Sequence, residues 1–228
     1  MNLIHTGNIN SSPVKMLSRR GVEENEVTIL NSAISRNRIS LVEHLISQQV
    51  PLNDRTDVGS TSLVLACELP IDTDIIQLLI QSGADTNIAN ADGIMPLHAA
   101  CKTHKIDIIE LLLAHGANIN AQDSVLYTPL HYAVDNDDDH IVHTLLQNGA
   151  DPSIVEQMGW NALVLALHGE HGRCAELILP YIKDINATAI NGWTPLMHAI
   201  RGASKDMVIK LVENGANSGH IRVSMGSN

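Results

Sequence analysis

The sequence contains no phenylalanine, and Phe, Trp and Tyr together make up only 2% of its 228 residues. An interior without large rings has to be filled by Leu, Ile, Val and Ala, which suits thin, closely spaced helices. Hydrophobic residues account for 44% of the chain, which is enough for a core. We therefore expect a helical protein that is not built around aromatic clusters.

Cysteine is also scarce. Cys67, Cys101 and Cys174 are odd in number and lack the spacing of metal ligands, so we expect free thiols and a reducing compartment. No run approaches the ~20 apolar residues of a membrane span, and the first residues have no apolar segment long enough for a signal peptide. We therefore expect a cytoplasmic or nuclear protein that does not insert into a membrane.

Positive charge is missing from a long internal stretch. Residues 106–172 contain no Lys or Arg but ten acidic residues, in a chain whose net charge is −11. Such a field repels phosphate backbones and anionic lipids and attracts cationic surfaces, an effect that salt weakens. We therefore expect no nucleic-acid partner, and a protein partner with a basic surface.

A period of 33 residues runs through the rest of the sequence. Its first marker is a position followed by Leu, and that position is occupied by Pro96, Pro129, Ala162 and Pro195. Its second marker is Gly-Ala-Asp or Gly-Ala-Asn, which begins at Gly83, Gly116, Gly149 and Gly215 and is replaced by Ile-Lys-Asp at 182–184. A fixed period of this length indicates a stack of identical supersecondary units.

The two markers, Thr-Pro-Leu-His and Gly-Ala-Asp, resemble those of ankyrin repeats. The resemblance covers nearly all of residues 25–219 and implies an all-α solenoid of about six helix-turn-helix repeats with short hairpin loops. The expected repeats are 25–55, 56–89, 90–122, 123–155, 156–188 and 189–219. We expect a poorly ordered tail at 1–24 and a short C-terminal tail at 220–228.

In ankyrin repeats, the hairpin tips and the exposed face of the first helix form a concave surface that usually binds partner proteins. The position just before the Thr of Thr-Pro-Leu-His is occupied in successive repeats by Ile94, Tyr127, Trp160 and Trp193. Large amphipathic rings among acidic residues are typical of an interface hot spot, although they can also brace each hairpin against its neighbour. Other candidates, chosen by their place in the repeat, are Asp92, Lys102, Ser124, Val125, Asp135, Asn136, Gln157, Met158, His168, Asn191 and Arg201.

Segments that suggest catalysis or metal binding have simpler explanations. The carboxylates that start at Asp135 alternate as in an EF-hand loop, but His140 replaces its turn Gly and Leu146 its bidentate Glu. His98 and His131 belong to the repeat motif and are expected to hydrogen-bond between neighbouring repeats. The other histidines have no evident third ligand, and no phosphate loop or nucleophile motif occurs. We expect no catalytic site, metal or cofactor.

We therefore interpret the chain as a non-enzymatic, monomeric interaction module, an adaptor or inhibitor. It would capture a basic segment of a partner protein on an acidic concave face centred on the third to fifth repeats, because a rigid solenoid loses little entropy on binding. The alternatives are a substrate-recruiting subunit of a ubiquitin ligase and a microbial effector that acts on host proteins. Ankyrin ligase receptors normally carry a C-terminal docking box, for which residues 220–228 are expected to be too few.

Overall fold

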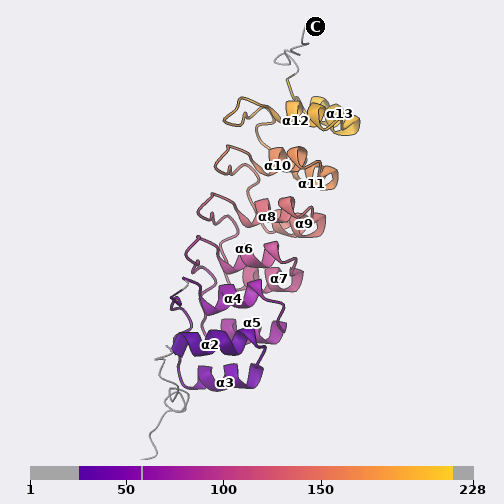
Figure 1. Ribbon diagram of the computed structural model, residues 1–228. Coiled ribbons are helices and arrows are strands. Elements are labelled where there is room, and N and C mark those ends of the chain that lie inside the picture. The colour runs from indigo at the N-terminus through magenta and orange to yellow at the C-terminus, as the bar shows by residue number, and fades with distance from the viewer. Residues whose placement is uncertain (1–25, 58, 218–228) are drawn as a thin grey trace, which may run out of the picture.

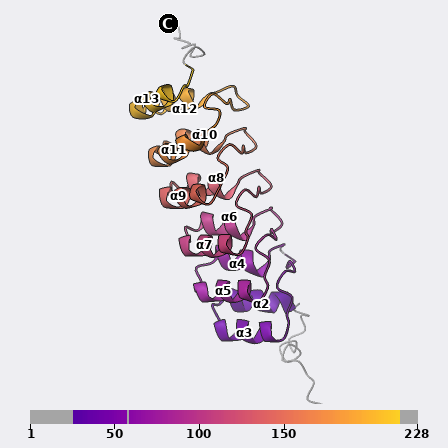
Figure 2. The same ribbon diagram turned by 180° about the vertical axis from the view of Figure 1, so that it is seen from behind.

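The computed structural model describes residues 26–57 and 59–217. In this part of the chain twelve α-helices form six pairs, without β-strands, and the pairs stack into one column (Figure 1). The loops between pairs all project from the same side of the column, which Figure 2 shows from behind. The tails expected at 1–24 and 220–228 lie outside the described residues.

Each pair consists of a first and a second helix. The first helices are α2 (Glu26–Ser35), α4 (Ser62–Glu68), α6 (Pro96–Lys102), α8 (Pro129–Asp135), α10 (Ala162–His168) and α12 (Pro195–Arg201). The second helices are α3 (Ile39–Ser47), α5 (Thr73–Gln81), α7 (Ile106–Ala114), α9 (Asp139–Gln147), α11 (Gly172–Ile178) and α13 (Lys205–Glu213). The expected all-α repeat solenoid is confirmed, and we number its repeats one to six in chain order.

The repeat motif sets where the helices begin and end. Pro129 occupies the first turn of α8, where an amide would have no partner, and Thr128 caps that helix by accepting the amide of His131. Asn161 caps α10 in the same way, at 2.9 Å from the amide nitrogen of Val164. After α7 the chain turns at Gly116, whose φ of +79° favours glycine. The motif residues are therefore chiefly structural.

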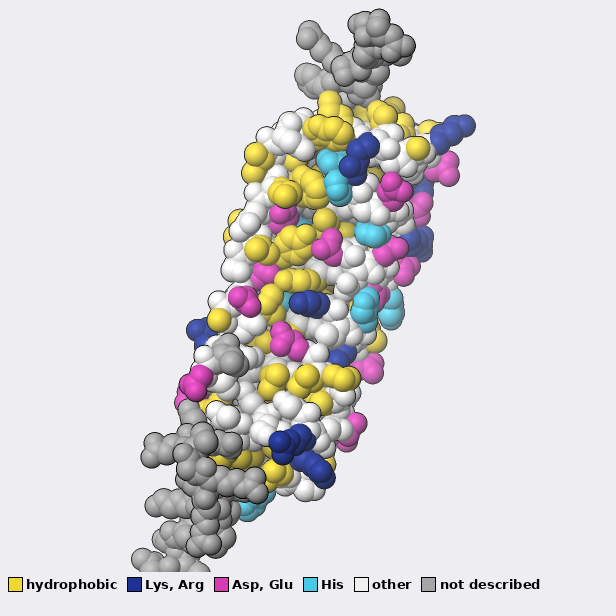
Figure 3. All heavy atoms as spheres, viewed as in Figure 1, with side chains coloured by type: hydrophobic (Ala, Val, Ile, Leu, Met, Phe, Trp, Pro, Cys, Tyr) yellow, Lys and Arg dark blue, Asp and Glu magenta, His cyan; other side chains and the backbone are white. Residues whose placement is uncertain are grey.

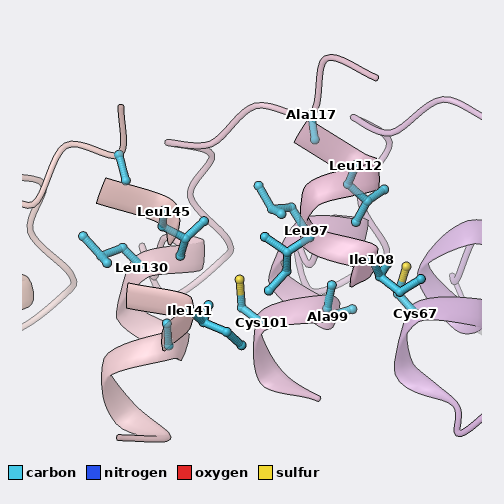
Figure 4. Close-up of a cluster of buried hydrophobic side chains, with 14 of the residues drawn as sticks. Cys67, Leu97, Ala99, Cys101, Ile108, Leu112, Ala117, Leu130, Ile141 and Leu145 are labelled. Carbon is cyan, nitrogen blue, oxygen red and sulfur yellow. The ribbon is translucent and has the colours of Figure 1, made fainter. Parts of the chain in front are cut away.

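The core extends as one cluster along the whole column. It is made of aliphatic side chains such as Leu97, Leu112 and Leu130, which point between the helices of neighbouring pairs (Figure 4). Cys67 and Cys101 occupy equivalent buried positions and are free thiols, and burial raises the pKa of Cys67 to about 12. Because much of each repeat's apolar surface is covered by its neighbours, stability comes from stacking.

The second and fifth repeats depart from the common form. The turn between α4 and α5 spans 69–72 and is one residue longer than the 103–105 turn between α6 and α7. In the fifth repeat, α11 has only seven residues and continues into the 3-10 helix η2 (Leu179–Tyr181). Pro180 lies in η2, and its missing amide cannot continue an α-helical ladder. The early end of this helix accompanies the loss of the Gly-Ala-Asp marker, which Ile-Lys-Asp replaces at 182–184.

Candidate functional site

Five-residue hairpin turns precede the first helices of repeats two to six, at 56–60, 90–94, 123–127, 156–160 and 189–193. In each turn the amide of the first residue donates to the carbonyl of the fifth, as from Thr56 to Ser60 (2.9 Å), from Asp123 to Tyr127 (3.0 Å) and from Glu156 to Trp160 (3.0 Å). Carboxylates reinforce two turns, because Asp123 accepts the amide of Tyr127 at 2.8 Å and Glu156 that of Trp160 at 3.0 Å. The turns therefore fix the backbone of their fifth residue, which carries the aromatic side chain in the fourth to sixth repeats.

The four residues of the aromatic position differ in exposure. Ile94, Tyr127 and Trp160 are half-buried and pack against the core, which supports the bracing role. Trp193 is 36% exposed and is available for contact. The four residues of this row, which the sequence presents as uniform, therefore differ in how much of each side chain is exposed.

The two tryptophans belong to one ring cluster that joins the fifth and sixth repeats. The ring of Trp160 lies 4.3 Å from that of His168 and 5.7 Å from that of His198, measured between centroids. Trp193 lies 5.1 Å from His198, and the guanidinium of Arg201 donates to Nδ1 of His168 at 2.9 Å. Four predicted residues, Trp160, His168, Trp193 and Arg201, meet in this cluster. His198 joins them but was not predicted, because it is displaced by one residue from the motif His.

Tyr127 forms a second cluster in the fourth repeat. Its ring packs edge-on against Tyr132 with 5.4 Å between centroids, and the Tyr132 hydroxyl donates to Asp123. Burial, together with the nearby Asp135 carboxylate, raises the pKa of Tyr127 to about 12. Tyr132 was missed as a candidate, although its position directly after the motif His131 marks the exposed side of the first helix.

A row of polar residues lies at the ends of the first helices. Lys102, Asp135, His168 and Arg201 are the last residues of α6, α8, α10 and α12, and all but the half-buried His168 are exposed. The side-chain amide of the neighbouring Asn136 donates to the carbonyls of Cys101 (3.2 Å) and Lys102 (3.3 Å). This side chain is therefore less available to a partner than predicted.

The remaining predicted residues lie on the hairpin tips, which touch one another. The amide of Ser124 donates to the carbonyl of Asp92 at 3.0 Å, and the Gln157 side chain donates to the carbonyl of Ser124 at 3.2 Å. Met158 accepts the amide of Ile190 at 3.1 Å. Val125 and Asn191 are also exposed at these tips. The predicted tip residues therefore form one continuous edge of the column.

Two exposed apolar tip residues were missed. Ile190 is 77% exposed and adjoins Met158, which is 60% exposed. Leu126 has a φ of +63°, in a turn position that glycine occupies in the other four hairpins. A bulky side chain is strained in this left-handed region. The absence of glycine at position 126 was the sequence signal that could have marked Leu126 as a candidate.

The ten acidic residues of 106–172 are spread over the repeats. Asp123 and Glu156 are buried in their hairpins, whereas Asp135 belongs to the candidate surface. Three more, at the start of α9 and in the turn before it, pair with neighbouring repeats through Asp137–His171 (3.4 Å), Asp138–His104 (2.9 Å) and Asp139–Arg173 (3.6 Å). In the face seen in Figure 3, acidic, basic and histidine side chains all lie among hydrophobic ones.

The motif histidines connect neighbouring repeats, as predicted. Nε2 of His98 donates to the carbonyl of Ala121 at 3.0 Å in its own repeat and to that of Tyr127 at 3.2 Å in the next repeat, and Nε2 of His131 donates to the carbonyl of Trp160 at 3.3 Å. Burial lowers the pKa of both imidazoles. Val164 holds this position in the fifth repeat, and it lines a pocket of ≈ 150 Å³ together with Ala187. The fifth and sixth repeats thus lack the histidine connection.

The acidic segment at 135–139 does not converge on a common point. Its carboxylates have separate partners: Asp135 contacts Tyr127, Asp138 contacts His104 of the preceding repeat, and Asp137 and Asp139 contact His171 and Arg173 of the following repeat. No group of three or more potential metal ligands occurs among the residues that the structure describes. None of the helices in this part of the chain is both long and apolar enough to span a membrane.

Comparison with known proteins agrees with this geometry. A family model described as ankyrin repeats, in three copies, matches residues 63–156 and 136–221. The chain is similar to the crystal structure of an ankyrin repeat domain from Acinetobacter baumannii AYE, with 26% sequence identity and a TM-score of 0.76. That match covers 83% of this chain and 98% of the other. No curated protein sequence gives a significant match.

Proposed function

Because the chain belongs to the ankyrin-repeat family, we propose that it is a monomeric protein-interaction module, an adaptor or inhibitor, of the cytoplasm or nucleus. Ankyrin repeats generally mediate protein–protein interactions and are typically non-enzymatic. The partner would bind the face formed by the hairpin tips and the ends of the first helices. Three buried free cysteines suit a reducing compartment.

The observation that carries this proposal is the apolar edge at the tips of the fourth to sixth repeats. Met158, Ile190 and Trp193 are exposed there, and Val125 and Leu126 continue the edge into the fourth repeat. Clustered exposed apolar side chains with polar neighbours mark interaction sites, and Trp is a frequent hot-spot residue. The tips are joined by hydrogen bonds, so little order has to be gained on binding.

The partner would supply a basic segment. Asp92 and Asp135 are exposed beside the apolar edge, and 106–172 contributes no positive charge to oppose a cation. Pairing with exposed carboxylates contributes to encounter rate more than to affinity, so association should slow as salt rises.

The experiment is affinity capture from the source cell, with quantitative mass spectrometry of the bound proteins. A Met158→Ala/Trp193→Ala variant removes two exposed side chains, and Ile209→Ala/Val212→Ala is the matched control on exposed positions of α13. We expect the partner to be lost only with the first variant, with a roughly 10- to 100-fold weaker Kd when both are purified. Identical protein lists from both variants would contradict a site at the tips.

A further inference from the structure

The face proposed to bind a partner also presents charges in a fixed order. We propose that it binds a polyproline II segment in which charged residues recur at every third position with signs that complement this order. The inference rests on the proposed function and refines its basic segment: basic residues would face the carboxylates of the surface, and acidic residues would face Lys102 and Arg201.

The order of charge comes from the last residues of five successive first helices, α4 to α12. We call this set the helix-end row: Glu68, Lys102, Asp135, His168 and Arg201. Its members are exposed except for the half-buried His168. Nδ1 of His168 accepts a hydrogen bond from Arg201, so this nitrogen carries no proton. The row therefore reads negative, positive, negative, neutral, positive.

The members of the row end equivalent helices of one stack, which places them along one line of the column, and the pairs at the two ends of the row interact. Lys102 opposes the rise that burial causes in the pKa of Glu68. At the other end, the Arg201 guanidinium also donates to the carbonyl of His168 at 3.0 Å. A partner segment that follows this line would meet one charge per repeat.

The spacing of the repeats favours one backbone conformation. Packed helices lie about 8–10 Å apart, and a polyproline II helix advances about 9 Å per turn of three residues, so every third side chain faces the same way. A β-strand places residues three apart on opposite faces. The polyproline II period therefore matches one side chain per repeat on one face.

Aromatic residues line the same path. Tyr127 hydrogen-bonds to Asp135 of the row, and the ring of Trp160 lies 4.3 Å from that of His168. Trp193 is the most exposed of the three rings, whereas Tyr127 and Trp160 are half-buried and present only part of their rings. Rings of this kind dock the flat proline faces of polyproline II segments, whose fixed backbone loses little entropy on binding. The segment would thus carry proline between its charges. The charges would be basic opposite Glu68, acidic opposite Lys102, basic opposite Asp135 and acidic opposite Arg201.

Two synthetic peptides of identical composition test this order. KPPEPPKPPAPPE carries the complementary signs, whereas KPPKPPEPPAPPE exchanges only its central Glu and Lys. Labelled peptides would be titrated with the full chain at low salt, and binding measured by fluorescence anisotropy. We expect the first peptide to bind about tenfold more tightly, because two close charge pairs change from attraction to repulsion.

A charge-exchange variant supplies the second half of the test. Lys102→Glu/Asp135→Lys leaves the net charge unchanged and should reverse the preference, and Lys205→Glu/Asp206→Lys, an exposed exchange on α13, should not. Equal affinity for both peptides, or no binding of either, would overturn the inference. A partner that is captured through Trp193 while neither peptide binds would leave the proposed function standing and remove only this refinement.

Discussion

The hydroxyl of Tyr132 donates a 2.6 Å hydrogen bond to Asp123, which begins the hairpin turn of the same repeat. In the sixth repeat the equivalent pair is His198 and Ala189, and the methyl side chain of Ala189 cannot accept a hydrogen bond. His198 is only 2% exposed, and neither of its ring nitrogens has a hydrogen-bond partner. Burial, with smaller contributions from His168 and Arg201, lowers its pKa to about 4. One missing carboxylate thus leaves a buried polar ring unsatisfied.

Restoring this carboxylate should stabilise the protein. Ala189→Asp would provide an acceptor for His198 and for the turn amides, as Asp123 does in its own hairpin. We expect the free energy of unfolding in urea to rise by about 1 kcal/mol and the pKa of His198 to rise. Ala189→Asn is the matched control, because it caps the turn as Asn90 does without adding charge. A lower stability of the Asp variant than of the Asn variant at neutral pH would contradict this account.

A histidine at position 164 should strengthen the contact between the fifth and sixth repeats. Val164→His would fill the ≈ 150 Å³ pocket and bring a donor toward the next hairpin, as His98 and His131 do. We expect about 1 kcal/mol of added stability, measured by urea unfolding. Val164→Ala, which enlarges the pocket, should destabilise the protein instead. Equal losses in both variants would show that the pocket cannot admit an imidazole.

Acid should destabilise the array before its carboxylates titrate. The pKa of His198 is about 4 in the folded protein, below the value near 6.5 of an unfolded chain, so the unfolded state binds the proton first. The contribution of this residue to stability, roughly 3 kcal/mol, is fully present above about pH 6.5 and is lost as the pH falls toward 4. His98 and His131 shift in the same direction.

The variant His198→Leu isolates this contribution, since Leu165 fills the equivalent position of the fifth repeat. Urea unfolding between about pH 7 and about pH 4.5 should show a shallower loss of stability for the variant than for the natural chain. Parallel curves would mean that His198 does not govern the acid response.

Replacing Leu126 by glycine should raise the stability of the protein while it weakens partner binding. Leu126→Gly removes the left-handed strain at φ +63° and should raise the melting temperature, by an amount equivalent to about 1 kcal/mol. The same change removes an exposed apolar side chain from the proposed edge, so partner binding should weaken. Leu126→Ala is the control, because it removes the side chain but keeps most of the strain. A glycine variant that is less stable than the alanine variant would refute the strain.

Much of the fold could be predicted because an ankyrin repeat encodes its own local structure. Proline at the start of α6, α8 and α12, glycine such as Gly116 after a second helix, and the motif histidines all act within one repeat or upon the next. The early end of α11 was predictable for the same reason, since Pro180 stops a helix in any surroundings.

The candidate site was predicted in outline only. The register placed Trp193 and Met158 correctly on the exposed edge, but a register cannot show that Asn136 is held by two carbonyls of the preceding repeat. Counting acidic residues along the chain likewise could not show that Asp123 and Glu156 are buried in their hairpins.

The sequence by itself determined the period, the helix limits and the aliphatic core, because these depend on backbone chemistry within each repeat. Only the tertiary structure decided which charges remain on the surface, that Trp160 and Trp193 join through His198, and that the fifth and sixth repeats lack a histidine connection. These features arise between residues about 30 positions apart, and they depend on how neighbouring repeats stack.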